Sequence, residues 1–180
     1  MAGNQIFTIG YEGASQEDFI FTLKAKRIAC LIDIREVPIS RRKGFSKKVL
    51  ADSLSVHGIQ YVHLRGLGDP KEGREAARSG KMDLFKEIFL RHMETTVALH
   101  DLNQAAALAS DATSCLLCYE RDPRSCHRSV VAAKLMEGWN LVVKNIGVEN
   151  RNAGGKHSEI RDRTGINPCQ STATPGQKSR

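Results

Sequence analysis

A thiol, an imidazole and a guanidinium follow one another at Cys126, His127 and Arg128, shortly after an apolar run that is typical of a β-strand. Asp122, which a proline follows, or else Ser125 is suited to cap a helix at this point. The three side chains would then lie in the first turn of that helix, where unpaired amides and the helix dipole favour negative charge. The sequence therefore predicts a site here that binds an anion or takes part in catalysis.

Cys126 in such a turn is expected to have a lowered pKa, which makes a thiol nucleophilic near neutral pH. The alternative is that it serves as a small buried apolar residue. Arg128 can hold a carboxylate or phosphate through two parallel hydrogen bonds, or can pair with Asp33 or Glu120 and tie strand ends together. A cysteine-dependent phosphatase is excluded, because it needs an arginine six positions after the thiol and this chain has alanine there.

The other cysteines and the acidic residues allow further chemistries. Cys115 and Cys118 have the C-x-x-C spacing of zinc ligands, but residues three apart in a strand point to opposite faces, and a second pair of matching spacing is missing. We therefore predict no metal site from this pattern. The carboxylates at the predicted strand ends suit general acid and base roles, or a metal ion if they converge. Cys118 and Cys126 would form a redox pair only if the loop between them folds back.

Strand and helix patterns alternate along the chain. Short apolar runs predict strands at residues 6–9, 30–34, 60–64, 115–119 and 141–146. Helical spacing predicts helices at residues 16–26 and 46–57, two more between 81 and 110 that meet near His100 and Asp101, and one after 122. Glycines at positions 66, 68 and 73 indicate a long binding loop. We expect an α/β fold with an open, mostly parallel, Rossmann-like sheet of four to five strands and helices on both faces.

Polar side chains follow each of the first four predicted strands, namely Tyr11 and Glu12, Asp33 and Arg35, His63 and Arg65, and Tyr119 and Glu120. Open parallel sheets bind ligands beyond the carboxyl ends of their strands, so we expect these residues to share one crevice. Asp33 and Arg35 either pair with each other or serve as a proton acceptor and an anion clamp.

Lysine and arginine outnumber the acidic residues by 27 to 20, and the net charge of +7 favours polyanionic partners. Residues 41–48 hold several cations and no acid, so they either contact phosphate groups or form a solvated surface loop. The odd number of cysteines, five, and the lack of a secretory pattern at the start predict reduced thiols in the cytoplasm. No apolar run is long enough to predict a membrane span.

The length of 180 residues suits a single folded domain, which we place at residues 1–148. After residue 148 the chain is polar and rich in glycine, serine and threonine, with few apolar side chains to offset the entropy of ordering. Residues 149–180 are therefore expected to form a disordered polar tail.

Several ordered segments resemble the family catalogued as domain of unknown function 488, and the likeness extends from Ile6 to about Val148. The segments are Thr8–Gly13, Asp33–Arg41, Gly44–Lys47, Gly58–Tyr61, Leu67–Pro70 and Cys118–Arg128. The resemblance implies a small α/β fold and gives weight to these positions, among them Ser40 and Arg41. It supplies no reaction, because the family name itself states that no activity is established.

The favoured hypothesis is an enzyme that binds a phosphate-bearing substrate, a nucleotide or a nucleic acid, at the carboxyl ends of the strands. The predicted catalytic residues are Cys126, His127, Asp33 and Glu120. The predicted substrate-binding residues are Tyr11, Glu12, Arg35, Ser40, Arg41, Tyr119 and Arg128. One alternative is a non-catalytic nucleic-acid-binding module in which the strand-end residues form a structural ion-pair network. Another is a domain that binds a metabolite or a protein. The sequence does not identify a cofactor.

Overall fold

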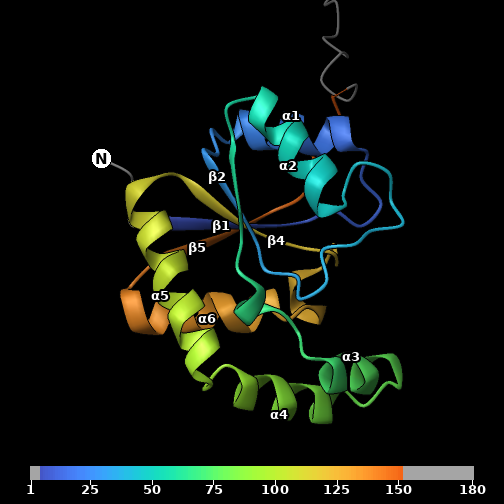
Figure 1. Ribbon diagram of the computed structural model, residues 1–180, viewed down its shortest axis with the longest axis vertical. Coiled ribbons are helices and arrows are strands. Elements are labelled where there is room, and N and C mark those ends of the chain that lie inside the picture. Colours follow the sequence, from blue (N-terminus) through green and yellow to red (C-terminus); the bar gives the residue numbers. More distant parts are fainter. Residues whose placement is uncertain (1–4, 152–180) are drawn as a thin grey trace, which may run out of the picture.

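The computed structural model describes residues 5–151, in which five strands form one sheet (Figure 1). The strands are β1 (Gln5–Gly10), β2 (Cys30–Asp33), β3 (Gln60–His63), β4 (Ser114–Cys118) and β5 (Val142–Ile146), in the order β3-β2-β4-β1-β5. Every neighbouring pair is parallel. The predicted α/β class and Rossmann-like sheet are confirmed, and each predicted strand is present with ends that differ by one residue.

Helices cover both faces of the sheet, as predicted (Figure 1). The α-helices are α1 (Gln16–Ala25), α2 (Lys47–Val56), α3 (Lys71–Arg78), α4 (Met82–His92), α5 (Thr96–Asp111) and α6 (Arg128–Trp139), and the short 3-10 helices are η1 (Arg65–Leu67) and η2 (Pro123–Ser125). Figure 1 shows α1 and α2 on one face and α5 and α6 on the other, with α3 and α4 extending the second layer away from the sheet.

Alternate residues of the central strands point into two separate cores. On the α1 and α2 side, Leu117 of β4 packs in one cluster with Phe19 and Leu50. On the other side, Leu116 belongs to a cluster that includes Leu102 of α5. Because both faces are covered, the strands are nearly continuous apolar runs, which is why the sequence revealed them.

The segment between β3 and α4 is not the long loop that its glycines indicated. η1 follows β3 closely, and α3 begins at Lys71, directly after Pro70. Gly73 lies inside α3, where a β-carbon would overlap Oδ1 of Asp69. This glycine therefore serves a close approach between two segments and does not mark a turn.

The two helices predicted between residues 81 and 110 meet at 93–95, and the junction expected near His100 and Asp101 is wrong. Thr95 caps α5, because its hydroxyl accepts a hydrogen bond from the N–H of Ala98 at 3.3 Å. Asp101 lies within α5 and accepts a hydrogen bond from the N–H of Gly66 at 2.7 Å. The carboxylate thus fixes η1 against α5.

The helix predicted after residue 122 also begins later than expected. Asp122 caps only the 3-10 turn η2, in which its carboxylate accepts a hydrogen bond from the N–H of Arg124 at 2.9 Å. Cys126 follows in an extended conformation, with φ −128° and ψ 142°, and α6 starts at Arg128. Cys126 and His127 therefore precede the long helix, and of the three residues only Arg128 lies in its first turn.

β4 lies between β1 and β2 in the sheet, although it follows both in the sequence. The chain leaves β1 and β2 toward α1 and α2, but it leaves β4 toward α6 on the opposite face (Figure 1). Neighbouring strand ends whose chains diverge in this way form a topological switch point, where open α/β sheets bind ligands. The carboxyl end of β4 is such a point.

Residues 149–151, the start of the predicted tail, contact α1. Glu149 forms an ion pair of 2.7 Å with Lys26, and the N–H of Arg151 donates to Asp18 at 3.0 Å. The rest of the predicted tail, residues 152–180, lies outside the described residues. Within residues 5–151, no helix combines the length and apolar character that crossing a membrane requires.

Candidate functional site

A cleft of about 1030 Å³ opens at the carboxyl ends of β1, β2 and β4. Its walls come from the segment after β2, from the segment that contains α3, and from the turn between β4 and α6. The predicted site residues that line it are Tyr11, Arg35, Ser40, Arg41, Tyr119, Glu120 and His127. The predicted site residues outside its lining are Glu12, Asp33, Cys126 and Arg128. The strand ends thus converge, but not all of their side chains face the same space.

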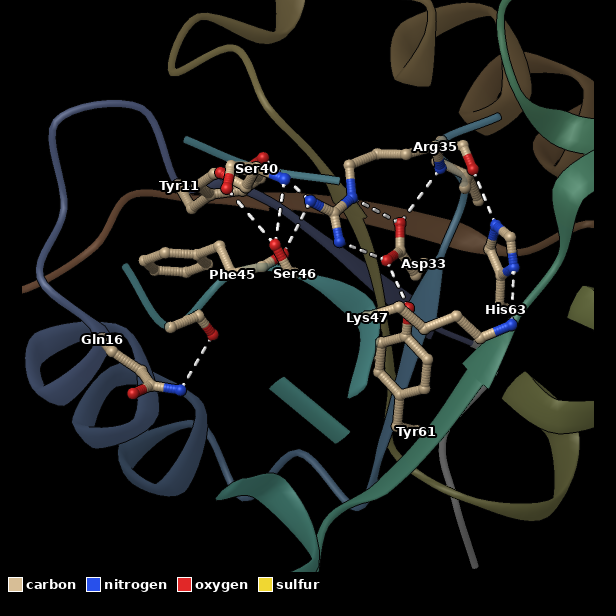
Figure 2. Close-up of polar contacts among 12 residues, drawn as sticks. Tyr11, Gln16, Asp33, Arg35, Ser40, Phe45, Ser46, Lys47, Tyr61 and His63 are labelled. Atoms are coloured by element: carbon tan, nitrogen blue, oxygen red, sulfur yellow. Dashed lines mark hydrogen bonds and ion pairs between the residues drawn. The ribbon is translucent and has the colours of Figure 1, made fainter. Parts of the chain in front are cut away.

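Asp33 and Arg35 form a buried ion pair at the end of β2 (Figure 2). The Arg35 Nε and Nη2 atoms lie 2.8 and 2.5 Å from the two carboxylate oxygens, and Nη1 donates to the Tyr11 hydroxyl and to the Phe45 carbonyl. Tyr61 donates to the same carboxylate at 2.5 Å, and burial together with the charge of Asp33 raises the pKa of this phenol. Of the two roles left open for this pair, mutual pairing is therefore the one observed.

The Arg35 guanidinium also positions one wall of the cleft (Figure 2). The Tyr11 ring, whose hydroxyl it contacts, stacks on Phe45 with ring centroids 4.3 Å apart and meets Tyr119 edge to face at 5.3 Å. Ser40 accepts a hydrogen bond from the N–H of Arg42 and donates its own N–H to Ser46. The wall is thus a stiff aromatic stack beside a hydrogen-bonded loop.

Arg128 is buried, with 1% of its surface exposed, and it holds the turn after β4 in place. Its guanidinium donates to the main-chain carbonyls of Glu120 and Arg121, and it pairs with neither of the carboxylates expected as partners. Glu12 holds the same turn from the β1 side, because its carboxylate accepts a hydrogen bond from the N–H of Arg121 at 3.0 Å. Both side chains position the turn, and neither faces the cleft.

Glycine is required at position 10 for this arrangement. Gly10 ends β1 opposite Cys118 of β4, and a β-carbon on it would overlap the carbonyl oxygen of Glu120. The resulting close approach lets the turn after β4 fold back over β1, where Arg128 and Glu12 hold it.

Four side chains gather where this turn meets β4. The Cys118 sulfur donates to the Glu120 carboxylate at 2.9 Å, and Nδ1 of His127 lies 3.6 Å from that sulfur and 4.0 Å from the sulfur of Cys126. The four atoms that could bind a metal ion, one from each residue, all lie within 4.8 Å of one another. The loop between Cys118 and Cys126 therefore does fold back. We call Cys118, Glu120, Cys126 and His127 the sulfur cluster.

The expected lowered pKa of Cys126 is wrong. Burial, and then the neighbouring Cys118, raise the pKa of this thiol, which is 4% exposed and precedes the helix instead of lying in its first turn. Burial also raises the pKa of Cys118. Burial therefore favours the protonated form of both thiols near neutral pH, which is the opposite of what an activated nucleophile at Cys126 requires.

The other two members of the sulfur cluster favour their charged forms. Burial opposes ionisation of Glu120, but hydrogen bonds from Cys118 and Cys126 outweigh it and lower the pKa of the carboxyl. Burial alone would lower the pKa of His127, but hydrogen bonding to Cys126 and to the Ile34 carbonyl raises it. Glu120 and His127 also line the cleft, so they can exchange protons with a bound ligand.

Asp69 is a titratable residue of the cleft that the sequence prediction missed. Burial, opposed by the charge of His127, raises its pKa to about 6. Its Oδ1 atom is buried and has no hydrogen-bond partner among residues 5–151. A carboxyl that titrates near neutral pH in a cleft suits acid or base catalysis. The signals in the sequence were its position before a proline in a glycine-rich segment and its place in the family segment Leu67–Pro70.

The rim of the cleft carries arginines that sequence reasoning did not select. Arg74 and Arg78 come from α3, and Arg42 from the loop after β2. Arg74 is engaged with Glu36 and the Asp69 carbonyl, and Arg42 donates to the Ala14 carbonyl. The side chains of Arg41 and Arg78 are exposed and make no hydrogen bond or ion pair with the rest of the described chain. These two guanidinium groups are free to meet an anion.

Comparisons with known proteins locate the chain at the level of a family. No curated protein and no solved structure matches the sequence. The family model described as "Domain of unknown function DUF488" matches residues 15–135, which is more than half of the chain and includes most of the cleft lining. The chain therefore belongs to the DUF488 family.

Proposed function

We propose that this protein is an enzyme that binds a phosphate-bearing substrate, a nucleotide or a nucleic acid, in the cleft at the end of β4. The observation that carries the proposal is the arrangement of charge in this cleft. Free guanidinium groups of Arg41 and Arg78 stand at the rim, and the proton-exchanging groups Asp69, Glu120 and His127 line the same space. An arginine that has no internal carboxylate partner is well suited to bind phosphate.

The cleft also offers a surface for a flat ring. Tyr119 is 46% exposed, and its edge contact with Tyr11 holds the phenol ring in place at the mouth of the cleft. Exposed aromatic rings beside a cationic groove bind the bases of nucleotides and single strands by stacking. A nucleotide would therefore place its base on Tyr119 and its phosphate toward the rim arginines.

The catalytic groups in this proposal differ from those first expected. Arg35 is paired inside the protein, and Arg128 is buried against main-chain carbonyls outside the lining of the cleft, so phosphate binding falls to Arg41 and Arg78. Cys126 is excluded as a nucleophile by its burial, and Asp69 takes the role of general acid or base beside Glu120 and His127.

Equilibrium binding of matched ligands tests the proposal. Fluorescently labelled nucleotides and short single-stranded DNA, with and without a terminal phosphate, would be titrated into the full chain at low salt. We expect the phosphorylated form to bind more tightly and the double variant Arg41→Ala/Arg78→Ala to lose about tenfold or more in affinity. Arg91→Ala is the matched control, because Arg91 is exposed on α4 and pairs only with Glu87. Equal binding of both forms, or an equal loss in the control, would contradict the proposal.

A non-catalytic nucleic-acid-binding module remains the second candidate, and one observation favours it. Asp33 and Arg35 form the structural ion pair which that hypothesis expects, and the cations of residues 41–48 are exposed. Affinity for nucleic acid would then fall steeply with salt but would not change in Asp69→Asn or Glu120→Gln. Loss of any turnover in these two variants, at unchanged affinity, would favour the enzyme. A location in the cytoplasm stays a prediction.

A further inference from the structure

We propose that the sulfur cluster is a binding site for a Zn²⁺ ion, with the sulfurs of Cys118 and Cys126, Nδ1 of His127 and a carboxylate oxygen of Glu120 as ligands. This inference does not depend on phosphate binding in the cleft; with an ion bound, Glu120 and His127 serve as its ligands and Asp69 remains the acid or base of the cleft. It departs from the sequence prediction, which found no zinc site at the Cys115 and Cys118 pair and otherwise allowed a metal ion only among converging strand-end carboxylates. Two thiolates, an imidazole and a carboxylate are ligands that Zn²⁺ takes in tetrahedral sites.

The distances within the sulfur cluster are close to those that a tetrahedral ion requires. Bonds of about 2.0–2.3 Å to zinc place neighbouring ligand atoms about 3.3–3.8 Å apart. Nδ1 of His127 lies 3.6 Å from the Cys118 sulfur and 4.0 Å from the Cys126 sulfur. The largest separation in the set is 4.8 Å. Small rotations of these side chains therefore suffice to close the site around an ion.

One ring nitrogen of His127 is already engaged in the way that metal-binding histidines require, so an ion has only to displace the proton on the other. Its Nε2 lies 3.2 Å from the Ile34 carbonyl, which can only accept a hydrogen bond, so Nε2 carries the proton. Nδ1 is then the ring nitrogen left to bind an ion, and a rotation of the imidazole is needed to aim it, because the Cys118 sulfur lies almost equally far from Nδ1 and Nε2, at 3.6 and 3.9 Å. Histidines that bind metals typically donate their other N–H to a carbonyl or carboxylate in this way. Phe89, whose ring meets the imidazole edge to face at 5.3 Å, further fixes its orientation.

The surrounding charge also suits a metal–thiolate centre. Two thiolates, a carboxylate and a neutral imidazole around a divalent ion leave one net negative charge. Arg128 is a buried cation without a carboxylate partner among residues 5–151, and its Nε has no hydrogen-bond partner there. Its main-chain N–H already points at the Cys126 sulfur, at 3.4 Å. The guanidinium itself donates to the main-chain carbonyl of Glu120, so a negatively charged centre that includes the Glu120 carboxylate would form close to this buried cation.

The site faces the cleft on one side only. Cys118, Glu120 and His127 line the cleft, whereas Cys126 lies behind them. Glu120 is the least buried of the four, so it is the ligand that can give way to water or to a substrate. The geometry thus points to three firm ligands and one exchangeable ligand, as in catalytic zinc sites, which keep one position open.

A disulfide between Cys118 and Cys126 is the competing interpretation of the two nearby sulfurs. The sulfurs are free thiols in the structure. A disulfide would leave unexplained why the Glu120 carboxylate and the His127 imidazole also lie within 4.8 Å of the two sulfurs, and it would add no negative charge near Arg128. The zinc site accounts for all of these features together.

Metal binding by the full chain tests the inference directly. The protein would be purified under reducing conditions, stripped with a chelator, and titrated with Zn²⁺ and with Co²⁺. We expect one tightly bound ion per chain, release of protons on binding, and sulfur-to-cobalt charge-transfer absorption of the strength that two thiolates give. Cys126→Ser should lower the affinity for Zn²⁺ by about 100-fold or more, and Glu120→Gln by a smaller factor.

Two cysteines serve as matched controls. Cys30→Ala removes a thiol that is buried in β2 outside the sulfur cluster, and Cys169→Ser removes the cysteine outside the described residues. Both variants should bind Zn²⁺ and Co²⁺ as the natural chain does. The inference is overturned if the unmodified chain shows no thiolate–cobalt absorption, if it contains a Cys118–Cys126 disulfide under reducing conditions, or if Cys126→Ser binds zinc unchanged while remaining folded by circular dichroism. Phosphate binding is measured separately, so each proposal can fail alone.

Discussion

The ends of β2 and β4 are neighbours in the sheet, but the polar side chains at the end of β2 are paired and several of those at the end of β4 are not. At the end of β2 the Asp33 carboxylate is paired with Arg35 and Tyr61, and the remaining guanidinium donors find Tyr11 and Phe45. At the end of β4 two thiols are kept protonated by burial, and Arg128 retains an unpaired Nε among the described residues.

The two strand ends therefore have different roles: the end of β2 supports the fold, and the end of β4 is the candidate for binding. A network in which every donor has an acceptor has little left to offer a ligand, and it stiffens the wall that it supports. A cluster whose imidazole, two thiols and neighbouring cation do not satisfy one another's hydrogen bonds and charges is suited to bind a further ligand. Both regions are polar and both follow a parallel strand, so polarity alone does not locate the functional site.

Removing Arg35 should produce the largest effect on stability. Arg35→Ala leaves the Asp33 carboxylate buried without its cation, and breaking such a pair costs about 3–5 kcal/mol in the free energy of unfolding. Urea denaturation measures it. Arg91→Ala removes an exposed ion pair with Glu87 and should change the free energy by less than about 0.5 kcal/mol. Similar small losses in both variants would show that the β2 network does not stabilise the fold.

A methyl group at position 10 should disturb the β4 end without touching the β2 network. In Gly10→Ala the added β-carbon overlaps the Glu120 carbonyl, and overpacking of this kind costs about 1–3 kcal/mol. The turn that carries Glu120 must move, so the affinity for Zn²⁺ should fall together with the stability. Gly147→Ala is the control, because the space around that glycine is open. Unchanged zinc affinity in a destabilised Gly10→Ala protein would separate the turn from the sulfur cluster.

The pH dependence of stability should reveal the unmatched carboxyl of Asp69. Its pKa is raised from 3.8 to about 6 in the folded chain, so the folded state holds the proton more tightly than the unfolded state does. The contribution of this group to stability is therefore greatest below pH 3.8 and is lost as the pH rises through 6.

Asp69→Asn removes this titration, so the variant should be more stable than the natural chain by about 1 kcal/mol above pH 7 and equal to it near pH 3. Both proteins would be unfolded in urea at several pH values, with a chelator present. Because the charges of His127 and Glu120 act on Asp69, the difference between the two chains measures the titration of Asp69 together with its coupling to these two groups. A difference that does not vary with pH would show that Asp69 is ionised throughout.

The sequence predicted the framework well because burial leaves a strong pattern. Strands covered on both faces are apolar runs. The helix predicted at residues 46–57 is present as α2, and it ends just before Gly58, whose φ of +69° suits glycine. The start of α6 was misplaced because Asp122 and Pro123 are as suitable for one 3-10 turn as for a longer helix. That error of a few residues carried over to the pKa of Cys126.

The candidate site was harder to predict because its partners come from distant segments. The choice between pairing and anion binding for Arg35 depends on Tyr61 and on the Phe45 carbonyl, which no local pattern connects to it. Cys118 and Glu120 are two positions apart, so in an extended chain their side chains point to the same side. The C-x-x-C spacing of Cys115 and Cys118 drew attention away from this pair. The rim arginine Arg78 was missed because its helix was expected to be a loop.

One residue joins the two contrasting regions. Ile34 stands between Asp33 and Arg35; its N–H donates to the Leu117 carbonyl of β4, and its own carbonyl receives the Nε2 proton of His127. The backbone that carries Arg35 on one side therefore carries, one residue earlier, the acceptor that orients this imidazole. If both proposed sites are occupied, we expect a ligand that shifts the Arg35 wall to change the affinity of the sulfur cluster for its ion through this residue.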